Sequence, residues 1–167
     1  MTICKEYIQI LNEATSKKKQ VKKFFDILKR KKDEKNIISL FTGLHYEIFE
    51  EIDCLQCANC CNTVGPMVTD NDIQKMAGYL KTKPSAIVSE YLRIDEDRDY
   101  VFKAMPCPFL NQENHLCQIY ESRPKACREY PHTDDRRLPK LLPITYKNTF
   151  ICPAVYLIVK KAMLEIK

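Results

Sequence analysis

The chain has 167 residues, a formal net charge of +5 and 45% hydrophobic residues, which is the size and composition of one globular domain with its own core. It has no run near the roughly 20 apolar residues that a membrane-spanning helix needs, and its first residues lack the basic and apolar regions of a signal peptide. These features exclude a membrane span and predict a cytoplasmic protein.

Three helices are predicted ahead of the cysteine-rich part of the chain. Apolar side chains recur every three or four residues over about 3–14, 17–32 and 34–52. Thr2 and Asp33 are the expected N-caps of the first and third helices. The front of the chain is therefore expected to be α-helical.

We expect residues 1–52 to be a helical segment packed on the domain that follows, a cysteine-cluster metal-binding domain over residues 53–167. Cys4 lies at helical spacing from apolar neighbours in the first predicted helix, so we expect it to be a small core residue rather than a ligand.

The positive charge is concentrated in residues 1–36, which hold 11 Lys and Arg against 5 Asp and Glu, a net charge of +6. Lysines there alternate with Val21, Phe24, Phe25 and Leu28, which is the pattern of a helix with one solvated and one buried face. A basic tract can also bind nucleic acid, and this is the less favoured interpretation.

Helices are next predicted over about 72–81 and 84–91, the second with Pro84 in its first turn. The inward side chains of the first are expected to be Ile73, Met76, Ala77 and Leu80.

The pattern then changes to strand-forming residues. Tyr100–Phe102 and Cys117–Tyr120 are predicted to pair as a small hairpin, which would carry Cys107 and Cys117. The fold class is therefore α+β and mainly helical: a small cysteine-rich, metal-centred domain with a short hairpin and an N-terminal helical segment.

Two helix starts are predicted near the remaining cysteines. Ser122 and Pro124 favour a short helix with Cys127 in its first turn or so, and Cys152 is the expected N-cap of a last helix that begins with Pro153. Free backbone N–H groups and the helix dipole there favour the thiolate of Cys152. The polar stretch 132–147 between them is predicted to be an irregular loop. The last helix is expected to pack through Ala154, Leu157, Ile158, Ala162 and Leu164.

Eight cysteines are candidate metal ligands, and four of them lie within eight residues. Cytosolic thiols are kept reduced, so metal ligation explains them better than disulfides. The C-x2-C spacing suits a tetrahedral zinc site, and it also suits iron in a cluster of the 4Fe-4S type. The candidates are Cys54, Cys57, Cys60, Cys61, Cys107, Cys117, Cys127 and Cys152.

The adjacent pair Cys60 and Cys61 bears on how these ligands are shared. Neighbouring side chains point in different directions, so the two sulfurs do not easily serve one ion without a tight turn. Two arrangements remain open: two metal positions of four ligands each, or one four-thiolate centre with spare cysteines beside it.

Positive groups near the sulfurs would stabilise a centre of net negative charge. Arg123 and Arg128 flank Cys127 and are candidates for this supporting role. His115 and His132 lie close to cysteines but are not expected to be ligands, because thiols are plentiful. His45 is expected to lie on the surface.

The segments CLQCANCC, Cys107–Leu110, Cys117–Tyr120 and Arg123–Pro131 together resemble the YkgJ-type CxxCxxCC cysteine-cluster family, which is described both as zinc- or iron-chelating and as containing Fe–S clusters. The resemblance covers about residues 54–153 and implies that all eight cysteines fall on motif positions. Related domains occur in bacterial flagellin lysine N-methylases, so the resemblance also allows an enzyme.

The leading hypothesis is a cytoplasmic protein that holds zinc or iron through thiolates. The alternatives are an iron–sulfur redox or group-transfer enzyme of methylase type, and a zinc-stapled nucleic-acid module. The expected partner is a metal ion or cluster, with no membrane and, on the favoured interpretation, no nucleic acid; the sequence names no protein partner.

Overall fold

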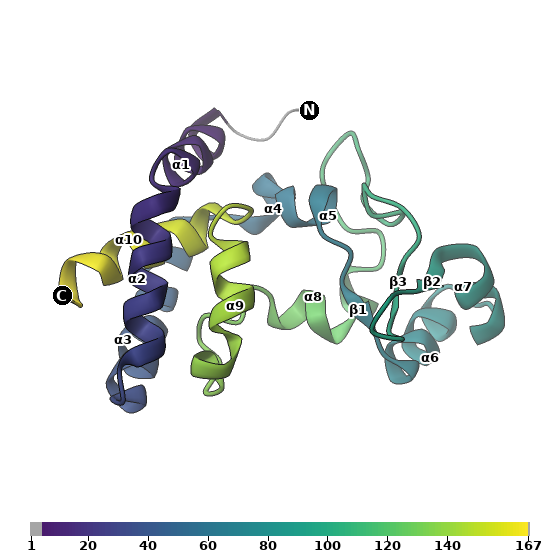
Figure 1. Cartoon of the computed structure of the whole chain (residues 1–167). Coiled ribbons are helices and arrows are strands. Elements are labelled where there is room, and N and C mark those ends of the chain that lie inside the picture. Colours follow the sequence, from purple (N-terminus) through teal and green to yellow (C-terminus); the bar gives the residue numbers. More distant parts are fainter. Residues whose placement is uncertain (1–4, 167) are drawn as a thin grey trace. The chain divides into compact units, whose positions relative to one another are not determined.

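A computed structural model describes residues 5–166 (Figure 1). Within this part, the chain divides into two compact units. One is continuous, Ala58–Tyr130, and we call it the central unit. The other, the terminal unit, comprises residues 5–57 and 131–166. Thr2 and Cys4 lie outside the described residues, and the domain boundary expected near residue 52 stays a prediction.

The terminal unit is built from helices. Helix α10 packs on α1 and α3, and α9 packs on α2 and α3, so the two ends of the chain share one core (Figure 1). The helices are α1 (Lys5–Ser16), α2 (Lys18–Arg30), α3 (Glu34–Phe49), the short α4 (Cys54–Cys57), α9 (Leu138–Asn148) and α10 (Pro153–Glu165).

The amphipathic pattern predicted for α2 is confirmed. Val21, Phe24, Phe25 and Leu28 are its buried residues, and the ring of Phe25 meets that of Tyr146 edge-on at 5.4 Å between centroids. Most of the lysines of this helix are exposed, as expected for a solvated face opposite a buried one.

The predicted loop at 132–147 is wrong over its second half, where α9 forms. Leu138, Leu142 and Thr145 are buried on one face of this helix. Its first proline lies in the first turn, where no intrahelical N–H bond is lost, and Pro143 is accommodated inside the helix. The prolines of this stretch favoured a loop prediction, whereas the spacing of its apolar residues agrees with the helix.

The last helix begins where predicted, with Cys152 as N-cap and Pro153 as first residue. Ala154, Ile158 and Ala162 are buried as expected, whereas Leu164 is 75% exposed and that expectation was wrong. Leu157 is only half-buried. Three further residues of the helix complete its buried surface: Val155, Tyr156 and Val159.

The central unit combines short helices with a three-stranded antiparallel sheet of order β1-β3-β2, which confirms a mainly helical α+β fold. In it, Val68 pairs with Tyr100, and Leu92 pairs with Phe102. Its elements are α5 (Asn59–Thr63), β1 (Met67–Val68), α6 (Asp70–Tyr79), α7 (Pro84–Tyr91), β2 (Leu92–Ile94), β3 (Tyr100–Phe102), the 3-10 turn η1 (Tyr120–Ser122) and α8 (Lys125–Glu129).

The predicted hairpin is wrong in its second strand. Residues 100–102 do form a strand, but they pair with β1 and β2. Cys117 makes one isolated bridge with Leu110, and the chain then turns into η1. Strand propensity identified the segment but not its partners, because β1 is only two residues long.

The core of the central unit gathers residues from the sheet, from α6 and α7 and from the segment after β3. Cys107 and Cys117 pack against this core. Leu80, expected to point inward, is 37% exposed because α6 ends one residue before it. The buried cluster consists of Val68, Ile73, Met76, Ala77, Ile87, Leu92, Phe102, Phe109 and Ile119.

No single helix of the described residues is long and apolar enough to cross a membrane. Helices α9 and α10 reach that length and composition only as a pair, with a bend of 117° between them.

The packing of α10 predicts a contrast between two substitutions. Ile158→Ala should lower the free energy of unfolding by about 2–5 kcal/mol, because it removes fully buried methyl groups. Leu164→Ala should change it by no more than about 0.5 kcal/mol. Urea unfolding followed by circular dichroism measures both, and equal losses would contradict this packing.

Candidate metal centre

The cysteine-rich motif is divided within the chain between α4 and α5. Cys54 and Cys57 are the first and last residues of α4 in the terminal unit, and Cys60 and Cys61 lie on α5 in the central unit. Ala58 separates the helices with φ 45° and ψ 15°, a left-handed conformation. The four thiols are therefore not carried by one continuous helix.

Five cysteines belong to the central unit, and we call them the central thiol group: Cys60, Cys61, Cys107, Cys117 and Cys127. The sulfurs of Cys60 and Cys61 are 4.0 Å apart. The N–H of Cys107 donates to the carbonyl oxygen of Cys61 at 2.8 Å. Two segments that are distant in sequence are thus joined directly at their cysteines.

Buried side chains anchor the segment that carries Cys107 and Cys117. Phe109 lies 4.7 Å from the ring of Tyr91 and 5.8 Å from that of Phe102, centroid to centroid. Ile119 is buried in the same core. Each of the two cysteines is thus followed, two residues later, by a core residue, which limits how far its sulfur can move.

The pKa values of the central thiols show that these side chains influence one another. A hydrogen bond with Cys60 lowers the pKa of Cys61 to about 7, against the effect of burial. Burial raises the pKa of Cys107 to about 11 and that of Cys127 to about 12, and the charges of neighbouring thiolates add to both shifts. Burial also raises the pKa of Cys117. Cys61 therefore ionises before Cys107, Cys117 and Cys127.

Arg123 places positive charge near these thiols. Its guanidinium lies 3.7 Å from the centroid of the Tyr120 ring and donates to the Tyr120 carbonyl at 2.6 Å. The charge favours the ionised forms of Cys117 and Cys127, and so acts against burial on both pKa values. The side chain of Arg128 donates to the carbonyl of Arg123.

Asp72 was not singled out from the sequence, although its side chain is 1% exposed. Its carboxylate accepts the N–H of Lys125 at 3.0 Å. The pattern Thr69-x-x-Asp72 signals a helix cap, but nothing in it signals a second partner in α8.

Three cysteines belong to the terminal unit, and we call them the terminal thiol group: Cys54, Cys57 and Cys152. Cys54 is exposed and the other two are buried. Burial raises the pKa of Cys152 to about 12, and the charges of Cys54 and Cys57 act in the same direction. Hydrogen bonds from the amides of Val155 and Ala154 oppose this. The N–H groups at the helix start thus favour the thiolate of Cys152, as expected, but burial outweighs them and the net pKa is raised.

The donor set fits zinc or iron in its chemistry, since thiolates are the ligands that both ions accept in closed protein sites. Within residues 5–166, no three His, Cys, Asp or Glu side chains are placed to hold a metal ion together. Binding in either thiol group would require the sulfurs to move closer together.

His45 departs from its expected surface position. Its side chain is only 16% exposed, its Nδ1 lies 2.8 Å from the hydroxyl of Thr133, and its Nε2 lies 3.9 Å from Asp134. Burial lowers the pKa of His45, and Asp134 opposes this. His45 therefore helps to attach the segment before α9 to α3. His115 and His132 both have positive φ, at 61° and 66°.

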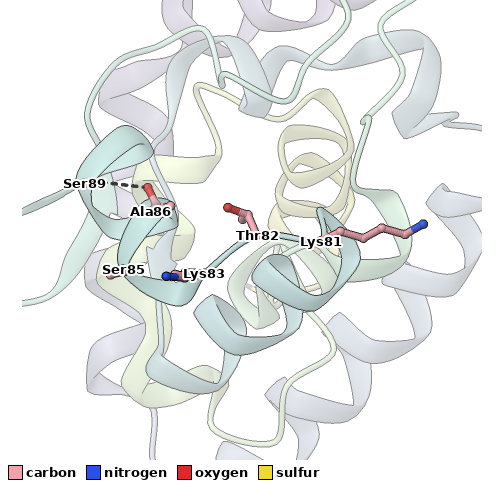
Figure 2. Close-up of a pocket in the computed structure, with 6 residues that line it drawn as sticks. All are labelled: Lys81, Thr82, Lys83, Ser85, Ala86 and Ser89. Carbon is pink, nitrogen blue, oxygen red and sulfur yellow. Dashed lines mark hydrogen bonds between the residues drawn. The ribbon is translucent and has the colours of Figure 1, made fainter.

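A shallow depression at the start of α7 offers no comparable chemistry (Figure 2). Its described lining contains no cysteine, histidine or carboxylate. The hydroxyl of Ser89 donates a hydrogen bond to the carbonyl oxygen of Ala86. Figure 2 shows Lys81 extending away from the other labelled residues. The lining residues are Lys81, Thr82, Lys83, Ser85, Ala86 and Ser89.

Residues 53–152 match the family model CxxCxxCC, described as "Putative zinc- or iron-chelating domain". This match covers more than half of the chain and contains every cysteine of the two thiol groups. The chain belongs to the CxxCxxCC family. The family's description, zinc- or iron-chelating, thus applies to a stretch of the chain that contains both thiol groups.

A relative of this CxxCxxCC protein is the "Uncharacterized protein MJ0661" of Methanocaldococcus jannaschii, 34% identical over 108 residues. The match covers 62% of this chain and 58% of the relative, so the chain spans little more than half of that protein's length. No solved structure matches the chain.

The pKa differences predict the order in which thiols of the metal-free protein react. At pH 7.5 Cys61 should be alkylated by iodoacetamide well before Cys127, because only the thiolate is nucleophilic. Mass spectrometry of quenched digests gives both rates. In denaturant, Cys61 and Cys127 should be alkylated at the same rate. Equal rates in the folded protein would contradict the predicted order of reaction.

Proposed function

We propose that this CxxCxxCC protein binds zinc or iron through the central thiol group, with Cys61, Cys107, Cys117 and Cys127 as ligands. The observation that carries the proposal is that these four thiols come from separate segments and yet the charge of Cys61 raises the pKa of each of the other three, while the N–H of Cys107 bonds to the carbonyl of Cys61. Four sulfurs complete a tetrahedral site, which favours a structural or electron-holding centre over hydrolytic chemistry.

The ligands have different roles in this proposal. Cys61 is the first to bind, since its pKa of about 7 makes a large fraction of it ionised at neutral pH. A bound cation then offsets the repulsion that opposes ionisation of Cys107 and Cys127. Cys60, beside Cys61, is a reserve ligand, and Arg123 compensates the negative charge of the completed centre.

For the terminal thiol group we propose a second set of ligands, Cys54, Cys57 and Cys152. The amides of Ala154 and Val155 support this assignment, because N–H donors to sulfur stabilise a metal-bound thiolate. Three sulfurs leave one coordination position of a tetrahedral ion for a further ligand.

The identity of the metal is decided by anaerobic purification followed by elemental analysis, an absorption spectrum and a sulfide assay. Colourless protein with stoichiometric zinc would exclude a 4Fe-4S cluster. Brown protein with acid-labile sulfide would exclude a purely zinc protein and would support the redox or group-transfer alternative. Protein that retains neither metal and binds neither when reconstituted would contradict the proposal.

Single substitutions assign the ligands. Cys127→Ser should reduce metal bound by the central group and lower the melting temperature, because metal binding and folding are coupled. Cys152→Ser should do the same for the terminal group. Ala126→Ser, one residue away on α8, is the matched control. Full metal content in either cysteine variant would show that the residue is not a ligand.

Metal affinity should increase with pH. Cys107 and Cys127 carry protons at neutral pH and must lose them to bind. Each proton released should strengthen binding about tenfold per pH unit between pH 6 and 8. Competition with a chelator of known protonation constants measures this slope. A slope of zero after correction for the chelator would rule these thiols out as ligands.

A further inference from the structure

Asp72 belongs to the first turn of α6, where its cap is already satisfied. One carboxylate oxygen, Oδ2, accepts the hydroxyl of Thr69 at 2.6 Å and its N–H at 3.1 Å. The N–H of Asp72 donates back to the hydroxyl at 3.2 Å. This capping box accounts for Oδ2 alone.

The other oxygen, Oδ1, serves a different helix. It accepts the N–H of Lys125, the first residue of α8, from 53 positions away in the sequence. The first N–H groups of a helix have no partner within the helix, and the N-cap residue of α8 is Pro124, whose side chain has no oxygen to accept them. Asp72 supplies the missing cap from α6. Cys127 follows two residues after the amide that is held.

The same oxygen also lies close to an arginine. Nη2 of Arg128 is 4.0 Å from Oδ1, and Nη1 of Arg128 donates to the carbonyl of Arg123. Arg123 is the residue whose charge favours ionised Cys117 and Cys127. One buried carboxylate is therefore linked to the backbone that carries Cys127 and to the arginine that compensates the thiolates.

We propose that Asp72 is a positioning residue for the central metal centre: it caps α8 in place of Pro124 and, through Arg128, holds Arg123 beside the sulfurs. This inference rests on the proposed function. Burial raises the pKa of the Asp72 carboxyl, but hydrogen bonds from Thr69 and Lys125 and the charge of Arg128 together outweigh burial and lower its pKa from the ordinary value.

The test compares Zn²⁺ and Co²⁺ affinity in Asp72→Asn, Arg128→Gln and the control Asp70→Asn. Asp70 is an exposed carboxylate in the same helical turn. Loss of a supporting group typically weakens metal binding about 10- to 100-fold, and we expect this for the first two variants. The control should stay within about twofold of the unsubstituted protein. The thiolate-to-Co²⁺ absorption band should also shift in Asp72→Asn, which a mere loss of stability would not cause.

The outcomes separate the two proposals. Unchanged affinity and an unchanged Co²⁺ band in both variants would overturn the positioning role while leaving metal binding intact. Absence of Zn²⁺, iron and Co²⁺ binding in the unsubstituted protein would overturn the proposed function instead. If Asp72→Asn does not fold, Arg128→Gln decides alone, since its side chain is partly exposed and the capping bond to Lys125 remains.

Discussion

The burial of several thiols close to one another, where negative charge is disfavoured, is the constraint on which the central unit depends. A buried thiol is tolerated as a small apolar group, but a buried thiolate is not. Burial is therefore the main reason that the pKa values of Cys107 and Cys127 are high, and the charges of neighbouring thiolates raise them further. A soft cation removes the repulsion and supplies bonds to sulfur. Cys107 and Cys127 therefore carry protons at neutral pH, and a bound positive ion would favour their thiolate forms.

The backbone that carries these sulfurs is anchored by core residues and by a backbone hydrogen bond. Phe109 and Ile119 are core residues just after Cys107 and Cys117, and the Cys107 amide is bonded to the carbonyl of Cys61. Such anchors limit the backbone movement that closure on a metal would need. Rotation of side chains about their first torsion is the remaining freedom, and it costs little compared with refolding a loop.

Patterns of neighbouring residues in the sequence predicted those features that depend on neighbouring residues alone. The buried face of α2 and the start of α10 at Pro153 follow from spacing and capping rules. Cys127 lies in the first turn of α8 as predicted, but the N-cap is Pro124 and not Ser122, which ends η1. Predictions failed where distant segments decide: the partners of β3, the net effect of burial on Cys152, and the second bond of Asp72 across 53 residues. None of these features produces a periodic pattern in the sequence, because each depends on residues that are distant in the sequence and close together in the fold.

The boundary between the two units at Ala58 has a consequence for folding during synthesis. Everything from Ala58 to Tyr130 is one continuous segment, so on a ribosome the central unit and all its thiols are available for folding before α10 has been synthesised. Cys54 and Cys57 emerge earlier still, yet their unit requires the last helices of the chain. Cys60 and Cys61 thus lie in a unit that is complete before α10 is synthesised, whereas Cys54 and Cys57 lie in a unit whose packing includes α10.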